Sequence, residues 1–165
     1  MVREKNAKTA SLIVAAVVLL CSFVYVPDWS VIGVAEGCPL IARFGYSIFH
    51  VSFFHALVNV WCMLSVVFLY DVSVWRLLEA YTVAVIVPDF LLSDLPTVGL
   101  SCICYVLLGS LTFEVRRKLY FQLCMALYIG VGFIFPSINV AIHIYGYLAG
   151  LLVGLLNAPL PCFRK

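Results

Sequence analysis

The chain has 165 residues, of which 65% are hydrophobic and only 11% are charged, and its net charge is +2. A soluble domain carries about a quarter charged residues and roughly half apolar ones, so a water-soluble fold of this length could not bury so much apolar surface. The composition excludes an ordinary soluble domain and leaves no room for a separate one beside a membrane bundle. We therefore predict an all-α, multi-pass protein of the lipid bilayer, most simply the cell membrane, with residues 1–165 forming one domain.

The apolar residues come in blocks close to the length that spans a bilayer, about 20 residues. The first block is stopped by Pro27, and no A-x-A cleavage site follows it, so we expect a retained helix rather than a signal peptide. The blocks predict six transmembrane helices, at about residues 9–26, 46–69, 77–87, 98–113, 119–135 and 140–157.

Basic residues predict the orientation of these helices, because they accumulate in cytoplasmic loops. Six spans with both termini inside place nearly all of them in the cytoplasm: Arg3, Lys5, Lys8, Arg76, Arg116, Arg117, Lys118, Arg164 and Lys165. Arg43 is the one basic residue left outside, where the loops carry the acids Asp28, Glu36, Asp89 and Asp94.

The seven cysteines give no sign of a cofactor, a metal site or a structural disulfide. Their number is odd, most lie in apolar blocks, and none forms a CxxC pair or has a histidine at metal-ligand spacing. We interpret them as small buried hydrophobic residues. There is also no basic, aromatic-interleaved patch that would predict nucleic-acid binding.

Polar side chains inside membrane helices are costly and usually face the bundle interior or a water-filled cavity. Here they gather in three of the predicted spans, as His50, His55 and Asn59 in the second, Ser101 in the fourth and His143 in the sixth. All three of these helices enter from the outside. At about 1.5 Å per residue, Ser101 and His143 should lie about 5–8 Å below their helix starts, and His55 about twice as deep. The three polar sites are thus expected to share the outer half of the membrane.

The spacing of these residues also predicts which sides face one another. His55 and Asn59 are four residues apart on one helix side, as are Ser101 and Tyr105. Small residues on a helix stripe allow close backbone approach in lipid, and such a stripe follows His143 as Gly146, Gly150 and Gly154. If this stripe packs against the fourth helix, which carries Gly99 and Gly109, the His143 imidazole comes within hydrogen-bond reach of Ser101.

A serine beside a histidine is the minimum for nucleophilic acyl transfer, in which the histidine takes the hydroxyl proton and returns it to the leaving amine. No acid lies at that depth to orient the base, since Glu79 belongs near the cytoplasmic end of the third helix. The arrangement is therefore a dyad, with ring stacking on Tyr105 as a possible support. The available donors for an oxyanion are His55, Asn59 and the Ser101 backbone N–H.

These motifs resemble those of the rhomboid family of intramembrane serine proteases. The matching motifs are His55-x-x-x-Asn59, Gly99-x-Ser101 with Tyr105 and Gly109, and His143-x-x-Gly146-x-x-x-Gly150, with His50 at a position where the family often has histidine. The resemblance covers about residues 9–157 and implies a six-helix fold.

The resemblance further implies a role for each matching residue. Ser101 would be the nucleophile and His143 the general base, with His55 and Asn59 in the oxyanion hole. Tyr105 would stack under His143, and His50 would support the outer loop and cavity. The substrate would be a transmembrane protein whose helix has small, helix-weakening residues near its outer end. It would enter, or be capped, at the predicted fifth helix and the apolar loop 88–96.

Two departures from the family pattern stand out. The family reads Gly-x-Ser-Gly, and here Cys102 occupies the fourth position. We expect this small side chain to be tolerated, provided that it leaves the Ser101 N–H free. The first loop is also short and lacks the Trp-Arg pair common in the family, since Trp29 and Arg43 are far apart.

Plainer interpretations stand beside the catalytic one. An early helix serine commonly bonds back to its own helix, His55 and Asn59 could form an ordinary interhelical pair, and Tyr105 and His50 could be structural. The alternative function is a catalytically inactive rhomboid-like protein that binds transmembrane helices. A small transporter is poorly supported, because the polar cluster stops about halfway through the membrane. The sequence leaves the oligomeric state and the identity of the substrate open.

Overall fold

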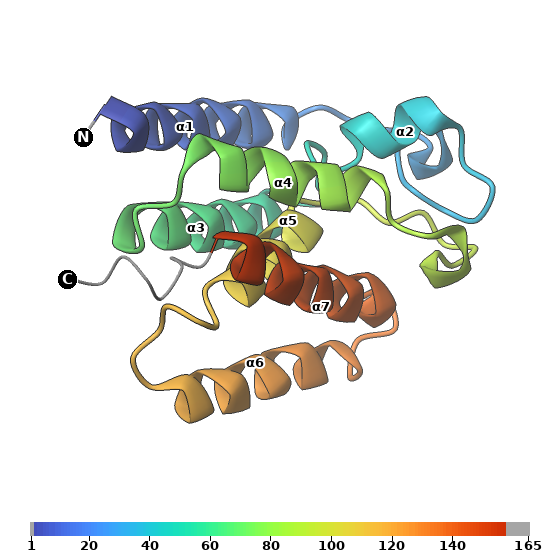
Figure 1. The fold of residues 1–165 in the computed structure, drawn as a ribbon. Helices are drawn as coiled ribbons and strands as arrows, with labels where there is room; N and C mark the ends of the chain where they lie inside the picture. Colours follow the sequence, from blue (N-terminus) through green and yellow to red (C-terminus); the bar gives the residue numbers. More distant parts are fainter. Residues whose placement is uncertain (1, 158–165) are drawn as a thin grey trace.

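The computed structural model describes residues 2–157, with side chains from residue 6, and all regular structure in this range is helical (Figure 1). The described residues contain no β-strand and only one isolated antiparallel bridge, between Val34 and Thr97. Seven α-helices follow one another in this range: α1 (Val2–Cys21), α2 (Leu40–Gly45), α3 (Phe53–Leu69), α4 (Val74–Val85), α5 (Ser101–Ser110), α6 (Lys118–Gly132) and α7 (Val140–Asn157). Two 3-10 turns, η1 (Trp29–Val31) and η2 (Asp89–Leu91), lie in the connections.

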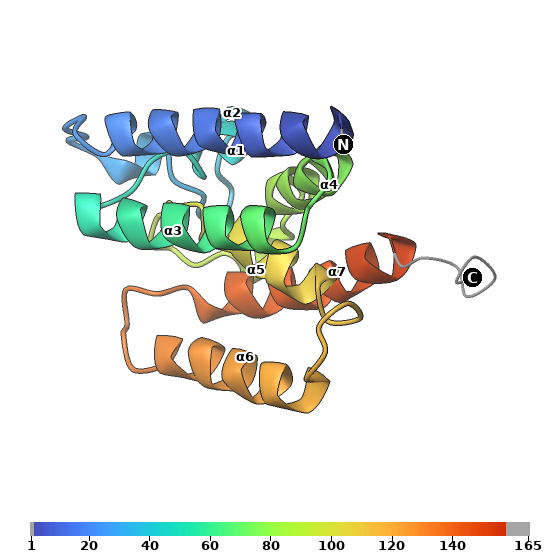
Figure 2. The same cartoon turned by 90° about the vertical axis from the view of Figure 1, so that its left-hand side faces the viewer.

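Helix α5 lies at the centre of the molecule. Figures 1 and 2 both show α1, α3 and α4 on one side of it and α7 on the other, with α6 outermost beyond α7. All but two of the residues of α5 are buried. Since the neighbouring helices cover α5 so completely, its sequence is apolar all round and shows no polar face.

The contact between α5 and α7 depends on glycine. A β-carbon at Gly109 would lie 2.3 Å from the carbonyl oxygen of Tyr147, and one at Gly150 would lie 2.3 Å from that of Val106. The same holds at Gly154, where the nearest atom is the Ser110 carbonyl oxygen at 2.5 Å. Real β-carbons do not come this close to backbone, so the predicted stripe of α7 lies directly against the backbone of α5.

Helix boundaries follow local capping rather than the ends of the apolar blocks. Helix α7 has the predicted bounds, but α3 begins at Phe53 instead of residue 46, because the Ser52 hydroxyl accepts a hydrogen bond from the His55 N–H at 3.2 Å. Ser73 caps α4 in the same way, with the Arg76 N–H at 3.2 Å, so this helix starts three residues before the prediction.

Other boundaries also differ from those predicted. Helix α1 runs from Val2 to Cys21 and not over the predicted residues 9–26: it begins earlier, within the basic segment, and ends before the non-helical residues that precede Pro27. Helix α2 lies in what was predicted to be a loop. Helices α4, α5 and α6 end earlier than predicted, at Val85, Ser110 and Gly132.

Length limits which helices cross a membrane unaided. Among the described residues, α7 alone is both long and apolar enough to do so by length and composition. Four apolar segments are shorter, namely Asn6–Cys21, Phe53–Leu69, Ser101–Ser110 and Lys118–Gly132. The shortest, α5, would extend about 15 Å at 1.5 Å per residue, which is half of a hydrocarbon core about 30 Å thick.

Charged side chains pair at the two ends of the helices. At one end, Lys8 Nζ lies 2.8 Å from the Asp71 carboxylate, and Arg76 lies 2.6 Å from that of Glu114. At the other end, Arg43 pairs with Asp89. The predicted basic residues Arg3, Lys5, Arg164 and Lys165 lie outside the residues whose side chains are described.

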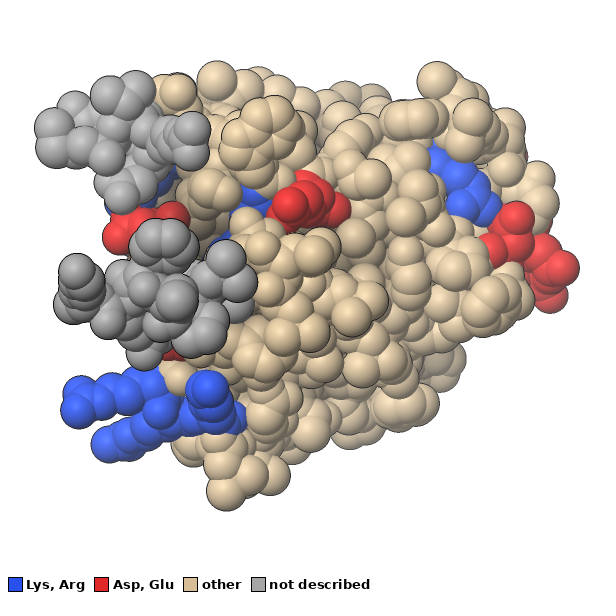
Figure 3. Space-filling view, viewed as in Figure 1, with Lys and Arg blue, Asp and Glu red and all other residues tan. Residues whose placement is uncertain are grey.

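Between these ends the surface is largely apolar. On the face shown in Figure 3, charged atoms gather toward the left and right sides and in one patch near the middle, and the rest of the surface carries none. Large hydrophobic side chains point outward from several helices, with exposed fractions of 74% at Trp61, 75% at Leu69 and 74% at Leu119. Exposed apolar surface of this extent is typical of proteins that contact a membrane or another protein.

We expect Gly150→Ala to destabilise the fold by about 1–3 kcal/mol, because its β-carbon meets the backbone of α5 and forces the two helices apart. Gly130→Ala in α6 is the matched control, since a β-carbon there has no atom within 4 Å. Alanine at that position should be neutral or stabilising by up to about 1 kcal/mol. Equilibrium unfolding in detergent measures both. Equal effects of the two changes would contradict the glycine contact.

Candidate active site

Ser101, His143 and His55 each lie in the first turn of a helix, and these three helices, α5, α7 and α3, begin at the same end of the molecule. The prediction that His55 lies twice as deep as the other two is wrong, because α3 begins at Phe53 and not near Tyr46. The three side chains consequently share one level, within a few residues of the helix starts.

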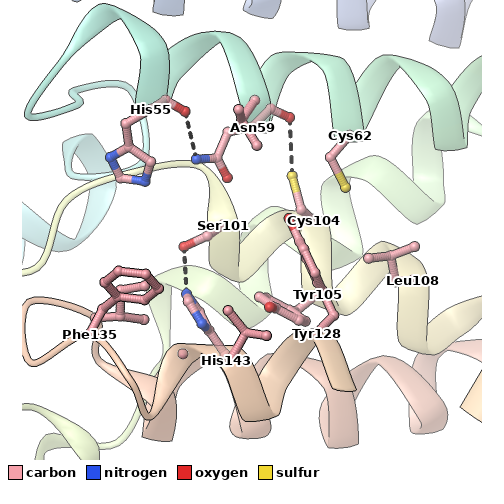
Figure 4. A pocket seen from close by; sticks show the side chains of 14 residues that line it. His55, Asn59, Cys62, Ser101, Cys104, Tyr105, Leu108, Tyr128, Phe135 and His143 are labelled. Atoms are coloured by element: carbon pink, nitrogen blue, oxygen red, sulfur yellow. Dashed lines mark hydrogen bonds between the residues drawn. The ribbon is translucent and has the colours of Figure 1, made fainter. Parts of the chain in front are cut away.

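Ser101 and His143 are hydrogen-bonded to each other. His143 Nε2 lies 3.0 Å from Ser101 Oγ (Figure 4). The imidazole also stacks on the Tyr105 ring, with centroids 4.5 Å apart and planes at 28°. Tyr105 contacts Tyr128 of α6 in turn, at 5.8 Å between centroids. The base is therefore held by a hydroxyl on one side and an aromatic face on another, and no carboxylate among the described residues contacts it.

The two polar residues of α3 lie across the cavity from His143. Asn59 donates one amide hydrogen to the His55 carbonyl oxygen at 2.9 Å, a bond within its own helix. Since a side-chain amide has two N–H donors, the second is left for another acceptor. The Nδ1 atom of His55 is buried and has no hydrogen-bond partner in the described part of the chain.

The backbone N–H of Ser101 is also free. The first N–H groups of a helix have no acceptor within it, and Ser101 opens α5 with no other acceptor among the described residues. The adjoining Cys102 side chain, only 1% exposed, points elsewhere. Its sulfur lies 3.3 Å from where a β-carbon of Gly146 would be, and it interacts with the Tyr46 hydroxyl. Cys102 thus fills the space toward α7 and leaves the Ser101 N–H open.

Gly99 sets the turn that presents Ser101. Its φ of 125° belongs to a region that side-chain-bearing residues rarely adopt. A β-carbon there would also lie 3.0 Å from Cε1 of His55. This backbone conformation explains why α5 begins at Ser101 and not at the predicted residue 98.

His50 is buried behind this turn and supports it. Its Nε2 accepts a hydrogen bond from the Leu100 N–H at 3.1 Å, while Nδ1 lies 3.3 Å from the Ile48 carbonyl oxygen. A neutral ring protonated at Nδ1 satisfies both contacts. The ring also meets His55 edge-on, at 4.9 Å between centroids. His50 therefore fixes the residue immediately before Ser101 without entering the cavity.

A cavity of about 180 Å³ joins these groups. Besides the predicted residues, its walls include side chains that the sequence reasoning passed over, namely Val58, Cys62, Cys104, Leu108, Tyr128, Val131, Gly132, Phe135 and Ile138. Two of them carry a readable signal: Cys62 is three residues after Asn59, and Cys104 three after Ser101, so each shares a helix side with a predicted residue. The wall from α6 has no such signal.

Arg43 of α2 anchors the loop between α1 and α3. Arg43, far from Trp29 in the sequence, contacts both the Val87 carbonyl oxygen and the Asp89 carboxylate. These contacts tie α2 to η2 on the same end of the molecule as the site. No group of three potential metal-ligating side chains occurs among the described residues.

Comparison with known proteins gives no match at the level of a protein-family model, a curated protein or a solved structure.

We expect His50→Ala to lower stability by about 1–3 kcal/mol, because it leaves the buried N–H of Leu100 without an acceptor. His50→Gln carries a side-chain oxygen that can accept this hydrogen bond, and it should recover part of the loss. Unfolding measurements on the two variants test the bond. If glutamine and alanine are equally damaging, His50 acts by filling space and not by holding Leu100.

Proposed function

We propose that the chain is a rhomboid-type intramembrane serine endopeptidase, which hydrolyses a peptide bond of a transmembrane-helix substrate near the outer membrane face. The observation that carries the proposal is the 3.0 Å hydrogen bond between Ser101 Oγ and His143 Nε2. These residues lie 42 positions apart in the sequence and on different helices, yet they meet in a cavity with unpaired donors.

The chemistry follows from these atoms. His143 Nε2 takes the hydroxyl proton as Ser101 Oγ attacks the scissile carbonyl carbon. The tetrahedral intermediate collapses when His143 gives this proton to the leaving amine, which leaves an acyl group on Ser101. Water, activated by His143 in the same manner, then releases the acyl group and restores the serine.

The negative oxygen of the intermediate needs preorganised donors. Three lie on the cavity side of the dyad: the free N–H of Ser101, the second amide hydrogen of Asn59 and the ring N–H of His55. They come from two helices, α5 and α3. The oxyanion would therefore form between these helices, opposite the imidazole on α7.

We propose that α1 and α3–α7 form six spans, with both termini cytoplasmic and the site opening outside. The ion pairs of Lys8 and Arg76 lie at the end where the spans would meet the cytoplasm, in agreement with the distribution of basic residues. Most of the surface between the two ends is uncharged in Figure 3, as contact with hydrocarbon would require. Because its neighbours enclose α5, this short helix need not itself match the bilayer thickness.

Helix α6 is the side from which we expect a substrate helix to approach. It forms the outer wall of the cavity through Tyr128 and Val131, and its outward side chains are apolar, with Leu127 70% exposed. A peptide that replaces these wall contacts reaches Ser101 directly from the lipid. The family resemblance suggests a substrate with small, helix-weakening residues at the cleavage site.

We expect a fluorophosphonate probe to label the protein in detergent or liposomes. Ser101→Ala should abolish labelling, because it removes the attacking oxygen. His143→Ala should slow it by at least about a thousandfold, because no base remains to take the proton. Cleavage of a transmembrane reporter substrate should fall in parallel. Binding of that reporter without Ser101-dependent labelling or cleavage would favour the alternative, an inactive protein that binds transmembrane helices.

A further prediction concerns Cys102, which occupies the position where the family pattern has glycine. Cys102→Gly restores the family motif, but the thiol faces Gly146 and Tyr46 and not the Ser101 N–H. We expect the labelling rate to change by less than about tenfold, equivalent to about 1.4 kcal/mol. Stability should fall by about 1 kcal/mol or more, because glycine is a poor helix residue and leaves a void. A much larger gain in labelling would mean that Cys102 obstructs the site.

A further inference from the structure

Two thiols line the cavity on the side away from His143. Cys62 comes from α3 and Cys104 from α5, and Figure 4 shows both sulfur atoms where these helices face each other. The Cys104 thiol donates to the Asn59 carbonyl oxygen at 3.4 Å. Cys104 is 3% exposed, whereas Cys62 is only partly buried.

The two thiols lie at the same cavity wall, one from each helix, near enough for their side chains to affect each other. None of the other described cysteines forms such a pair: Cys102 faces Gly146 and Tyr46, Cys124 lies exposed on α6, and Cys21 and Cys38 lie outside the cavity. All six are present as free thiols. The pair thus joins two different helices at the wall of the site that holds Ser101.

We propose that Cys62 and Cys104 form an oxidation site, at which a hydroperoxide converts the two thiols into a disulfide between α3 and α5. The partly exposed Cys62 reacts first. Its sulfur attacks the terminal peroxide oxygen, the O–O bond breaks, and the thiol proton leaves with the departing alcohol or water, so that a sulfenic acid remains on Cys62.

Cys104 then completes the reaction. Its sulfur attacks the sulfenic sulfur, the S–O bond breaks, and the Cys104 proton leaves with the hydroxyl as water. In total, two thiols and one hydroperoxide give one disulfide, one alcohol or water, and one further water. The oxidant is reduced by two electrons and the cysteine pair is oxidised by two.

The bond would reshape the cavity. A disulfide holds its sulfurs about 2 Å apart, closer than two thiols in contact, so α3 and α5 are drawn together and Cys104 can no longer donate to Asn59. Asn59 and Ser101 are both donors for the proposed oxyanion. This consequence rests on the proposed function: oxidation should slow the reaction of Ser101, since displacements of about 1 Å cost up to a hundredfold.

The test treats the purified full chain in detergent with hydrogen peroxide and maps its peptides by mass spectrometry. We expect a peptide that links Cys62 to Cys104, with the loss of two hydrogens. In the same samples, fluorophosphonate labelling should slow by about tenfold or more and recover after dithiothreitol. Sulfenic or sulfinic acid on Cys62 without the cross-link would overturn the inference.

Variants make the assignment specific. Cys62→Ser and Cys104→Ser should each make labelling insensitive to peroxide, relative to the same variant untreated. Cys124→Ser is the matched control, as an exposed cysteine outside the cavity, and it should stay sensitive. Phenylarsine oxide, which bridges neighbouring dithiols, should bind the untreated chain and require both cysteines. Its binding to either serine variant would count against the pair.

The failure of this inference is distinguishable from failure of the proposed function. If the cross-link forms but the reduced protein shows no Ser101-dependent labelling, the thiol pair stands and the proposed protease activity is overturned. If labelling depends on Ser101 but no cross-link forms, the protease proposal stands and the thiol pair is overturned.

Discussion

The close approach of α5 and α7 is the constraint on which the rest of the structure depends. Gly109 and Gly150 lie so near the opposite backbone that no side chain fits. In the membrane setting proposed above, lipid would provide no hydrophobic drive for helices to associate, and association would depend on such close van der Waals contact. The contact also fixes the register of the two helices. That register puts His143, one turn before the first glycine of the stripe, level with Ser101 at the start of α5. Removing the glycine contact would therefore separate a base from its hydroxyl, although no glycine touches either.

The starts of α3 and α5 position the remaining groups of the site. The Ser52 cap and the positive φ of Gly99 decide where α3 and α5 begin, and both beginnings lie at the cavity. A helix start has backbone N–H groups without acceptors and a partial positive charge. Placing Ser101 there gives the proposed nucleophile a donor in its own backbone. His50 keeps this start in position by accepting from Leu100, the residue just before it. The buried His50 thus holds the backbone at a point where a small shift would move the Ser101 hydroxyl.

Residue types and their spacing predicted the helix contacts and the site residues that depend on them. The helix boundaries, which depend on local capping and turns, were predicted poorly. Helix α7, the stripe of glycines and the meeting of Ser101 with His143 could be read from periodicity. The start of α3 was missed because residues 46–52 still hold apolar side chains, such as Ile48, Phe49 and Val51, between the polar ones. Ser52 was the available signal, as a capping residue before a helix. The wall that α6 contributes was beyond reach, since Tyr128 and Val131 share no helix with a predicted site residue and only the packing of α6 brings Tyr128 against Tyr105.

The lack of an acid beside His143 has a physical rationale in the proposed setting. A carboxylate added to Ser101 and His143 would bring a permanent charge into an apolar interior. The free energy of desolvating that charge can exceed what its pairing with His143 contributes. A dyad is neutral at rest. Charge then appears only during the reaction, as an imidazolium and an oxyanion that form together and attract each other strongly in a low-dielectric site. The Tyr105 ring is stacked on the imidazole, where the transient positive charge would form, while the donors of α3 and α5 face the negative oxygen. In such a site the orientation that an acid would provide is supplied by stacking, and the stacking depends in turn on the close contact between α5 and α7.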